Sequence, residues 1–251
     1  MNSILTTEMI GMPTTDVLTL LISENHQVSA IFAFTYRHPP LLQQRLALTV
    51  DEQTIIAKAK ALRETSRLPF WEALMLSCFG EHRDCTRFIE EASFHQSPRD
   101  SLMRISRDEV LSGRLAELSM EQPPGYHLSF SSRIEMTGHE VRNLPLLDFH
   151  CPENTENDRL VSEVCRQLFR RETLVFSSGE SYHALGLDTL GENEFREFLT
   201  RSLLFAPIVD ARYVAHQLLE GACALRLSHS NEKPNRPRLK FVVKERLEEQ
   251  P

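Results

Sequence analysis

Glycine is scarce in this chain, and its distribution excludes two large classes of nucleotide-binding fold. The 251 residues include nine glycines, and the closest two, Gly186 and Gly191, are five positions apart. Neither G-x-G-x-x-G nor G-x-x-x-x-G-K-[ST] occurs, although these turns bring backbone N–H groups against phosphates in Rossmann domains and in P-loop ATPases. The chain is therefore neither a Rossmann enzyme of the usual kind nor a P-loop ATPase.

The composition is typical of a soluble globular protein with enough length for a large core. Apolar residues make up 41% and charged residues 25%, and no apolar run approaches the roughly 18 residues that a membrane helix needs. Residues 1–8 lack the basic and then apolar pattern of a secretory signal. The five cysteines are an odd number and are scattered, which predicts no disulfide framework. We therefore expect a cytoplasmic protein without a membrane partner.

The charge is unevenly distributed along the chain. A formal net charge of −7 argues against a protein that coats nucleic acid indiscriminately. From Arg226 to Arg246, however, seven basic residues face two acidic ones, a local balance of +5. This stretch is either a phosphate-binding surface or a solvated basic strand and tail.

Hydrophobic patterning divides the chain into a helix-rich region over 1–122 and a mixed region over 123–251. The first region contains a predicted strand over 28–34 and helices that begin at Asp51, at Pro69 and near Arg87. The second region alternates the two patterns, which predicts an α/β or α+β fold with a mixed sheet and flanking helices. Its predicted helices cover 157–171, 194–204 and 211–220, and its predicted strands cover 126–130, 144–148, 174–176, 183–187, 224–227 and 239–243.

Polar clusters interrupt the apolar strands of the second region. Asp148 and His150 are two positions apart, so their side chains point to one face of a strand and can share a metal ion. Ser177–His183 forms a polar turn suited to an anion, and Asp210 ends another apolar run. Each cluster also has a structural explanation, since an aspartate at these points can cap the next helix and a histidine can be a satisfied core residue.

The order of these clusters resembles the catalytic domain of archaeo-eukaryotic-type primases and primase-polymerases over roughly residues 125–245. That family has an apolar strand ending in acid-x-acid, a helix, a Ser-Gly-x-Gly-x-His-like turn, a strand ending in Asp, and Leu-Arg-x-x-x-Ser with a basic residue beyond. The matching residues are Asp148-Phe149-His150, Ser178-Gly179-Glu180-Ser181-Tyr182-His183, Asp210, and Leu225-Arg226-Leu227-Ser228-His229-Ser230 with Lys233.

The resemblance implies nucleotidyl transfer from nucleoside triphosphates on a single-stranded template. Asp148, His150 and Asp210 would then be the catalytic metal ligands for Mg²⁺ or Mn²⁺, because in-line attack needs divalent metal at the attacking and leaving oxygens. Contacts to the nucleotide phosphates would come from Ser178, Gly179, His183, Arg226, Ser230 and Lys233.

Two positions depart from the family pattern. His150 replaces the second carboxylate, and this weakens Mg²⁺ most, because Mg²⁺ prefers oxygen ligands while Mn²⁺ tolerates nitrogen. The site is therefore either manganese-dependent or degenerate. Ser181 stands where the family often has glycine, which is a minor steric difference.

Three functions remain open at this point. The first is a primase-polymerase-like nucleotidyltransferase. The second is a catalytically weakened relative that binds nucleic acid or nucleotide beside a partner subunit, in replication or anti-phage defence. The third is a metal-dependent nuclease or phosphohydrolase built on Asp148, His150, His183 and Asp210, with Asp188 as the evident extra ligand.

A zinc site is not expected. Cys78, His82, Cys85 and His95 have a spacing that matches no common zinc motif, and the first three fall at i, i+4 and i+7 of one helix, where they need no metal.

Overall fold

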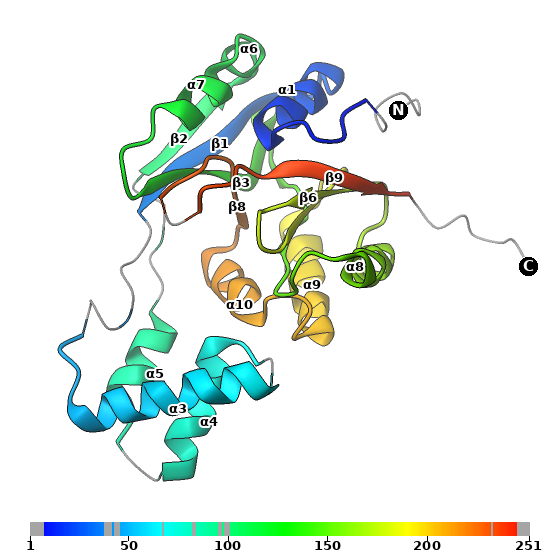
Figure 1. The fold of residues 1–251 in the computed structure, drawn as a ribbon. Helices are drawn as coiled ribbons and strands as arrows, with labels where there is room; N and C mark the ends of the chain where they lie inside the picture. Colours follow the sequence, from blue (N-terminus) through cyan, green and yellow to red (C-terminus); the bar gives the residue numbers. More distant parts are fainter. Residues whose placement is uncertain are drawn as a thin grey trace, which may run out of the picture. The chain divides into compact units, whose positions relative to one another are not determined.

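The computed structural model describes residues 8–37, 42, 46–66, 68–81, 84–94, 97, 101–231 and 233–244. It divides the chain into two compact units, Met1–His38 with Ser97–Pro251 and Pro39–Gln96. The smaller unit is thus inserted into the larger one in sequence (Figure 1). These units do not follow the expected division at residues 122 and 123, because strands from both sides of that boundary pair in one sheet. As a division by function, that boundary stays a prediction.

The smaller unit is helical and has a core of its own. It consists of α3 (Val50–Ser66), α4 (Phe70–Glu81) and α5 (Thr86–Ser93). The first two bury the apolar faces that their spacing predicts, with Ile55, Ile56 and Leu74 almost fully buried. Other apolar side chains of this unit are exposed: Leu76, Phe79, Ile89 and Phe94.

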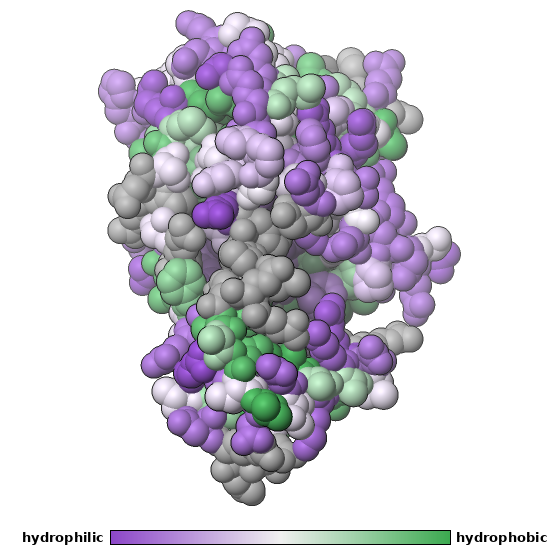
Figure 2. Space-filling model, turned by 60° about the vertical axis from the view of Figure 1, so that its left-hand side comes forward, coloured by the Kyte–Doolittle hydropathy of each residue, from purple (hydrophilic) through white to green (hydrophobic). Residues whose placement is uncertain are grey.

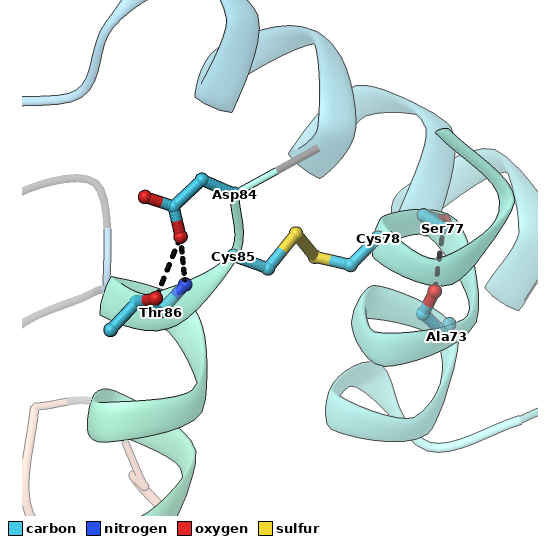
Figure 3. Close-up of a disulfide and its surroundings, with 6 residues drawn as sticks. All are labelled: Ala73, Ser77, Cys78, Asp84, Cys85 and Thr86. Atoms are coloured by element: carbon cyan, nitrogen blue, oxygen red, sulfur yellow. Dashed lines mark hydrogen bonds between the residues drawn. A yellow bond between two sulfur atoms is a disulfide. The ribbon is translucent and has the colours of Figure 1, made fainter. Parts of the chain in front are cut away.

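A disulfide links α4 to the start of α5. Cys78 and Cys85 are bonded, with their Cα atoms 6.1 Å apart (Figure 3). They do not share a helix, as the spacing suggested, because α4 ends at Glu81. The Asp84 carboxylate accepts hydrogen bonds from the N–H and the hydroxyl of Thr86, at 3.0 and 2.6 Å, which forms an Asx turn leading into α5. His82 and His95 lie outside the described residues.

The larger unit contains two antiparallel sheets, which confirms the α/β class; we had expected one mixed sheet. Every strand pairing within these sheets is antiparallel. The first sheet has the order β2-β1-β3-β4 with β8 also on β3, and the second has the order β5-β7-β6-β9. The strands of the first are β1 (Val28–Arg37), β2 (Leu102–Ser106), β3 (Tyr126–Met136), β4 (Val141–Asn143) and β8 (Ala224–Arg226). Those of the second are β5 (Leu146–Asp148), β6 (Thr173–Ser177), β7 (Tyr182–Gly186) and β9 (Arg238–Val243).

Helices flank both sheets, as expected. In Figure 1, α1, α6 and α7 lie together beside β1 and β2, whereas α8, α9 and α10 lie beside the second sheet. One hydrophobic core runs through the whole larger unit and includes residues from both sheets. The bounds are α1 (Thr14–Glu24), α6 (Arg107–Leu111), α7 (Arg114–Met120), α8 (Thr155–Leu168), α9 (Glu192–Ser202), the 3-10 turn η3 (Leu203–Phe205) and α10 (Ala211–Glu220).

The face of the molecule drawn in Figure 2 is predominantly polar where it is coloured. Figure 2 shows one face on which hydrophilic residues prevail and hydrophobic ones form smaller patches. Among the described residues, no helix has the length and apolar character to cross a membrane.

Candidate active site

Two polar side chains face each other where β5 and β7 pair. The register places Asp148 opposite His183, and the carboxylate Oδ1 lies 3.6 Å from the imidazole Nε2. The histidine is buried, while a third of the aspartate side chain is exposed. Asp148 is accessible because β5 is short: Pro145 has no N–H to donate, so the strand begins after it and ends three residues later.

Asp210 joins this pair from the other side of β5. The backbone continues the pairing beyond the strand, since the Asp210 N–H donates to the Asp148 carbonyl oxygen at 3.0 Å and the His150 N–H donates to the Ile208 carbonyl at 2.8 Å. The Asp210 Oδ2 lies 3.9 Å from His150 Nδ1. Residues that the sequence analysis grouped from separate segments are therefore neighbours in space.

The two carboxylate oxygens of Asp210 have different surroundings. Its Oδ1 accepts the Tyr213 N–H at 2.9 Å and caps α10, the structural role that the sequence already suggested. Its other oxygen is the one turned toward His150. Asp148, in contrast, caps no helix, because the N-cap of α8 is Asn154, whose side chain accepts from the Asn157 N–H.

Burial shifts the pKa values of Asp148 and His183 in this cluster. Burial and the neighbouring Asp210 raise the pKa of Asp148, although Lys233 and Arg226 act in the opposite direction. Burial and the same two cations lower the pKa of His183 to about 3, so its imidazole is neutral at pH 7. A cation bound between the two aspartates would stabilise both as carboxylates.

The polar turn between β6 and β7 is held by its own hydrogen bonds. The Ser178 N–H and hydroxyl both donate to the Ser181 carbonyl, at 2.8 and 3.0 Å, and the Ser181 hydroxyl donates to the Phe149 carbonyl. Gly179 has a φ of +99°, and a Cβ there would lie 2.8 Å from the Asn235 side chain. The turn therefore needs glycine at this position for its conformation and for the close approach of Asn235.

A carboxylate of the protein itself occupies donors of this turn. Glu153 accepts the Ser177 hydroxyl at 2.6 Å and the Gly179 N–H at 3.2 Å. Lys240 holds it from the other side at 3.5 Å and forms an ion pair with Asp158 at 2.8 Å. A phosphate that used the Gly179 N–H would have to displace Glu153. The contact of Glu153 with the turn could not be predicted from the sequence, because no local pattern links position 153 to residues 177–179.

Arg226 joins the two sheets instead of pointing freely into a cleft. It ends β8, and its guanidinium donates to the carbonyls of Ser178, Ser228 and Asn235 at 2.7, 2.7 and 2.6 Å. The planar fork of an arginine suits three acceptors from separate segments. It still acts electrostatically on the site, because Asp148 raises its pKa against the lowering effect of burial.

The two remaining predicted phosphate contacts also have partners within the chain. Ser230 closes a turn with Lys233 by backbone hydrogen bonds in both directions, and the Ser230 hydroxyl accepts the Lys233 N–H at 3.2 Å. The ammonium of Lys233 pairs with Glu180. Asp188, considered as an additional nuclease ligand, lies beyond the far end of β7 and pairs with Arg171 at 3.1 Å.

The donor set suits a divalent cation in its chemistry, although its arrangement is not that of a formed metal site. Within the described part of the chain, no three His, Cys, Asp or Glu side chains are placed together to hold a metal. The two carboxylates and the His150 imidazole nevertheless provide oxygen and nitrogen ligands that Mn²⁺ accepts.

Comparison with known protein families places part of the chain in one family. A family model described as archaeo-eukaryotic primase 1D-like (AEP-like) matches residues 108–238, just over half of the chain. No curated protein sequence and no solved structure matches the chain. The matched segment contains Asp148, the turn around Gly179, Asp210 and Arg226. The chain is therefore a member of the AEP-like family of archaeo-eukaryotic primase domains.

Proposed function

We propose that this protein is a nucleotidyltransferase of the primase-polymerase type, which adds nucleotides from triphosphates to a strand on a single-stranded template. The observation that carries the proposal is the approach of Asp148, His150 and Asp210, which come from two separate segments of a primase-family domain. In this reaction the 3′-hydroxyl oxygen forms a bond to the α-phosphorus, the bond to pyrophosphate breaks, and the hydroxyl proton is released.

The residues present have separate tasks in this proposal. Asp148, Asp210 and His150 would hold divalent metal, which supplies charge stabilisation to the attacking and leaving oxygens when bound. His183, neutral and buried behind Asp148, would donate a hydrogen bond to a phosphate oxygen or orient that carboxylate. Arg226 would keep the turn at Ser178 in place, through its bond to the Ser178 carbonyl.

The test is nucleotide incorporation on a primed single-stranded template, with Mg²⁺ and Mn²⁺ in parallel reactions. The variants Asp148→Asn and Asp210→Asn keep side-chain shape, and asparagine at 210 still caps α10. Each should abolish incorporation, whereas Asp188→Asn, beyond the far end of β7 and paired with Arg171, should leave it unchanged. Incorporation that survives both site variants would overturn the proposal.

A second candidate function is a binding subunit of the same fold without catalysis. It is favoured by the internal partners of the phosphate contacts: Glu153 on the Gly179 N–H, three carbonyls on Arg226, and Glu180 on Lys233. Cross-linking of nucleotide without incorporation in either metal would select this function.

A further inference from the structure

A polar pocket lies beside the candidate active site, and its arginines are not used by the proposed reaction. The pocket has a volume of about 590 Å³ and is lined by the turn after β6 and by the segment that leads into β9. Its main lining residues are Ser177, Gly179, His229, Asn235, Arg236 and Arg238.

The pocket carries positive charge that no carboxylate among the described residues neutralises by an ion pair. Arg236 contacts His229 at 3.4 Å and the Met120 sulfur, and Arg238 donates to the Gly11 carbonyl at 2.8 Å. Neither arginine forms an ion pair with a carboxylate in the described part of the chain. The neighbouring lysines differ, because Lys233 pairs with Glu180 and Lys240 with Asp158.

Two donors of the lining are already occupied by a carboxylate, because Ser177 and Gly179 donate to Glu153. Each of the two arginines carries five N–H donors, and only some of them reach an acceptor in the described part of the chain, so the arginines are the charged groups left for a ligand. Two guanidinium groups in an open polar pocket match phosphate oxygens, which they bind through paired N–H donors.

Hydrogen bonds of Arg226 connect the pocket to the candidate site. Arg226 donates to the carbonyl of Asn235, in the pocket lining, and to the carbonyl of Ser178, in the turn next to His183. A ligand of Arg236 and Arg238 would thus be separated from Asp148 by the turn that contains Ser178 and by His183, which faces Asp148. We propose that this pocket binds phosphate groups of a single-stranded nucleic acid and holds that strand next to the site. The placement of the strand for reaction rests on the proposed function, whereas the binding itself does not.

The experiment measures the affinity of a fluorescein-labelled single-stranded oligonucleotide by anisotropy, between about 50 and 300 mM salt. Each neutralised phosphate contributes about 0.7 to the slope of log K against log salt for single strands. The double variant Arg236→Gln/Arg238→Gln should therefore lower this slope by about 1.4 and weaken binding roughly tenfold or more at 100 mM salt. Arg236→Lys/Arg238→Lys, which keeps the charge, should restore most of the slope.

The control pair is Arg166→Gln/Arg196→Gln, which removes two exposed arginines of α8 and α9 that form ion pairs within their own helices. It should bind the oligonucleotide as the wild type does. A second arm measures binding of fluorescent ATP to the same variants. Loss of ATP binding with unchanged oligonucleotide binding would overturn the proposal, because the pocket would then hold the nucleotide.

Three further outcomes are informative. Unchanged oligonucleotide affinity in the double glutamine variant would overturn the proposal, as would a wild type that does not bind the oligonucleotide. A wild type that binds the strand through Arg236 and Arg238 but incorporates no nucleotide would support the pocket while removing the proposed function.

Discussion

The backbone N–H of Asp210 donates a hydrogen bond of 3.0 Å to the carbonyl oxygen of Asp148, a residue 62 positions earlier in the chain. The isolated bridge between Phe149 and Val209 belongs to the same pairing. Backbone pairing therefore brings together two acids that belong to different structural elements, independently of any ligand. Because the backbone holds the two acids, substitutions of neighbouring side chains such as His150 and Arg226 can test what each side chain contributes to activity or stability.

His150 should determine which metal supports activity. His150→Asp would place a third oxygen ligand beside Asp210 and should shift the ratio of incorporation in Mg²⁺ to that in Mn²⁺ roughly tenfold toward Mg²⁺, the scale on which changes around a metal act. His150→Ala should reduce activity in both metals while leaving the thermal melt nearly unchanged, since a third of the side chain is exposed. If activity in His150→Ala equals that of the wild type, the residue is no ligand.

Arg226 should matter for stability as well as for activity. Lysine cannot reach three carbonyl acceptors at once, so Arg226→Lys should lower the free energy of unfolding by about 1.5–3 kcal/mol, the range for a hydrogen bond to a charged group. Urea titration followed by circular dichroism measures this. Arg196→Lys, on the exposed face of α9, provides the control and should change stability by less than about 0.5 kcal/mol. Equal midpoints for the two variants would show that the three carbonyl contacts contribute nothing net.

Glu135 should contribute to stability at neutral pH and lose this contribution in acid. Hydrogen bonds from Arg104, at 2.9 and 2.8 Å, lower the pKa of Glu135 from 4.5 to about 2. Because the folded-state pKa is the lower one, the contribution is complete above the unfolded value and disappears as pH falls from about 4.5 through 2. Stability measured between pH 6 and 2 should therefore fall less steeply for Glu135→Gln than for the wild type. Parallel curves for the two proteins would contradict the ion pair.

The number of reactive thiols before and after reduction tests the disulfide between Cys78 and Cys85. Denatured, non-reduced protein should expose three reactive thiols, those of Cys151, Cys165 and Cys223, and five after reduction. Alkylation followed by mass spectrometry gives both numbers, and Cys78→Ser should give four thiols in either condition. Five thiols before reduction would mean that Cys78 and Cys85 are not bonded in the purified protein.

Periodicity in the sequence predicts the interior elements of the larger unit well. The spacing of Val161, Val164 and Leu168 predicted a helix over 157–171, and α8 covers Thr155–Leu168 with these residues buried. The strand predicted over 144–148 begins at Leu146 in the structure, directly after Pro145, which has no N–H for the ladder. Such elements are predictable because one face is buried and its apolar pattern is complete.

Elements with little buried surface were harder to predict. The strand β2 lies in the region over 1–122 that we expected to be helix-rich, and only Ile105 among its five residues is buried. It is an edge strand whose backbone pairs with β1, so neighbouring hydrogen bonds, not a local pattern, stabilise it. The helix α1 was also not predicted, although Val17, Leu18 and Ile22 do lie on a buried face.

The order of residue types along the chain was sufficient to identify the family, while the role of Asp148, His150 and Asp210 as its acids and ligand stays a prediction. It was not sufficient to find their partners. That Arg226 binds three carbonyls, that Glu153 occupies the Gly179 N–H, and that Arg236 and Arg238 share a pocket follow from contacts between distant segments. Strand register and core packing decide such contacts, because a hydrogen bond depends on distances of a few tenths of an ångström that no local pattern encodes.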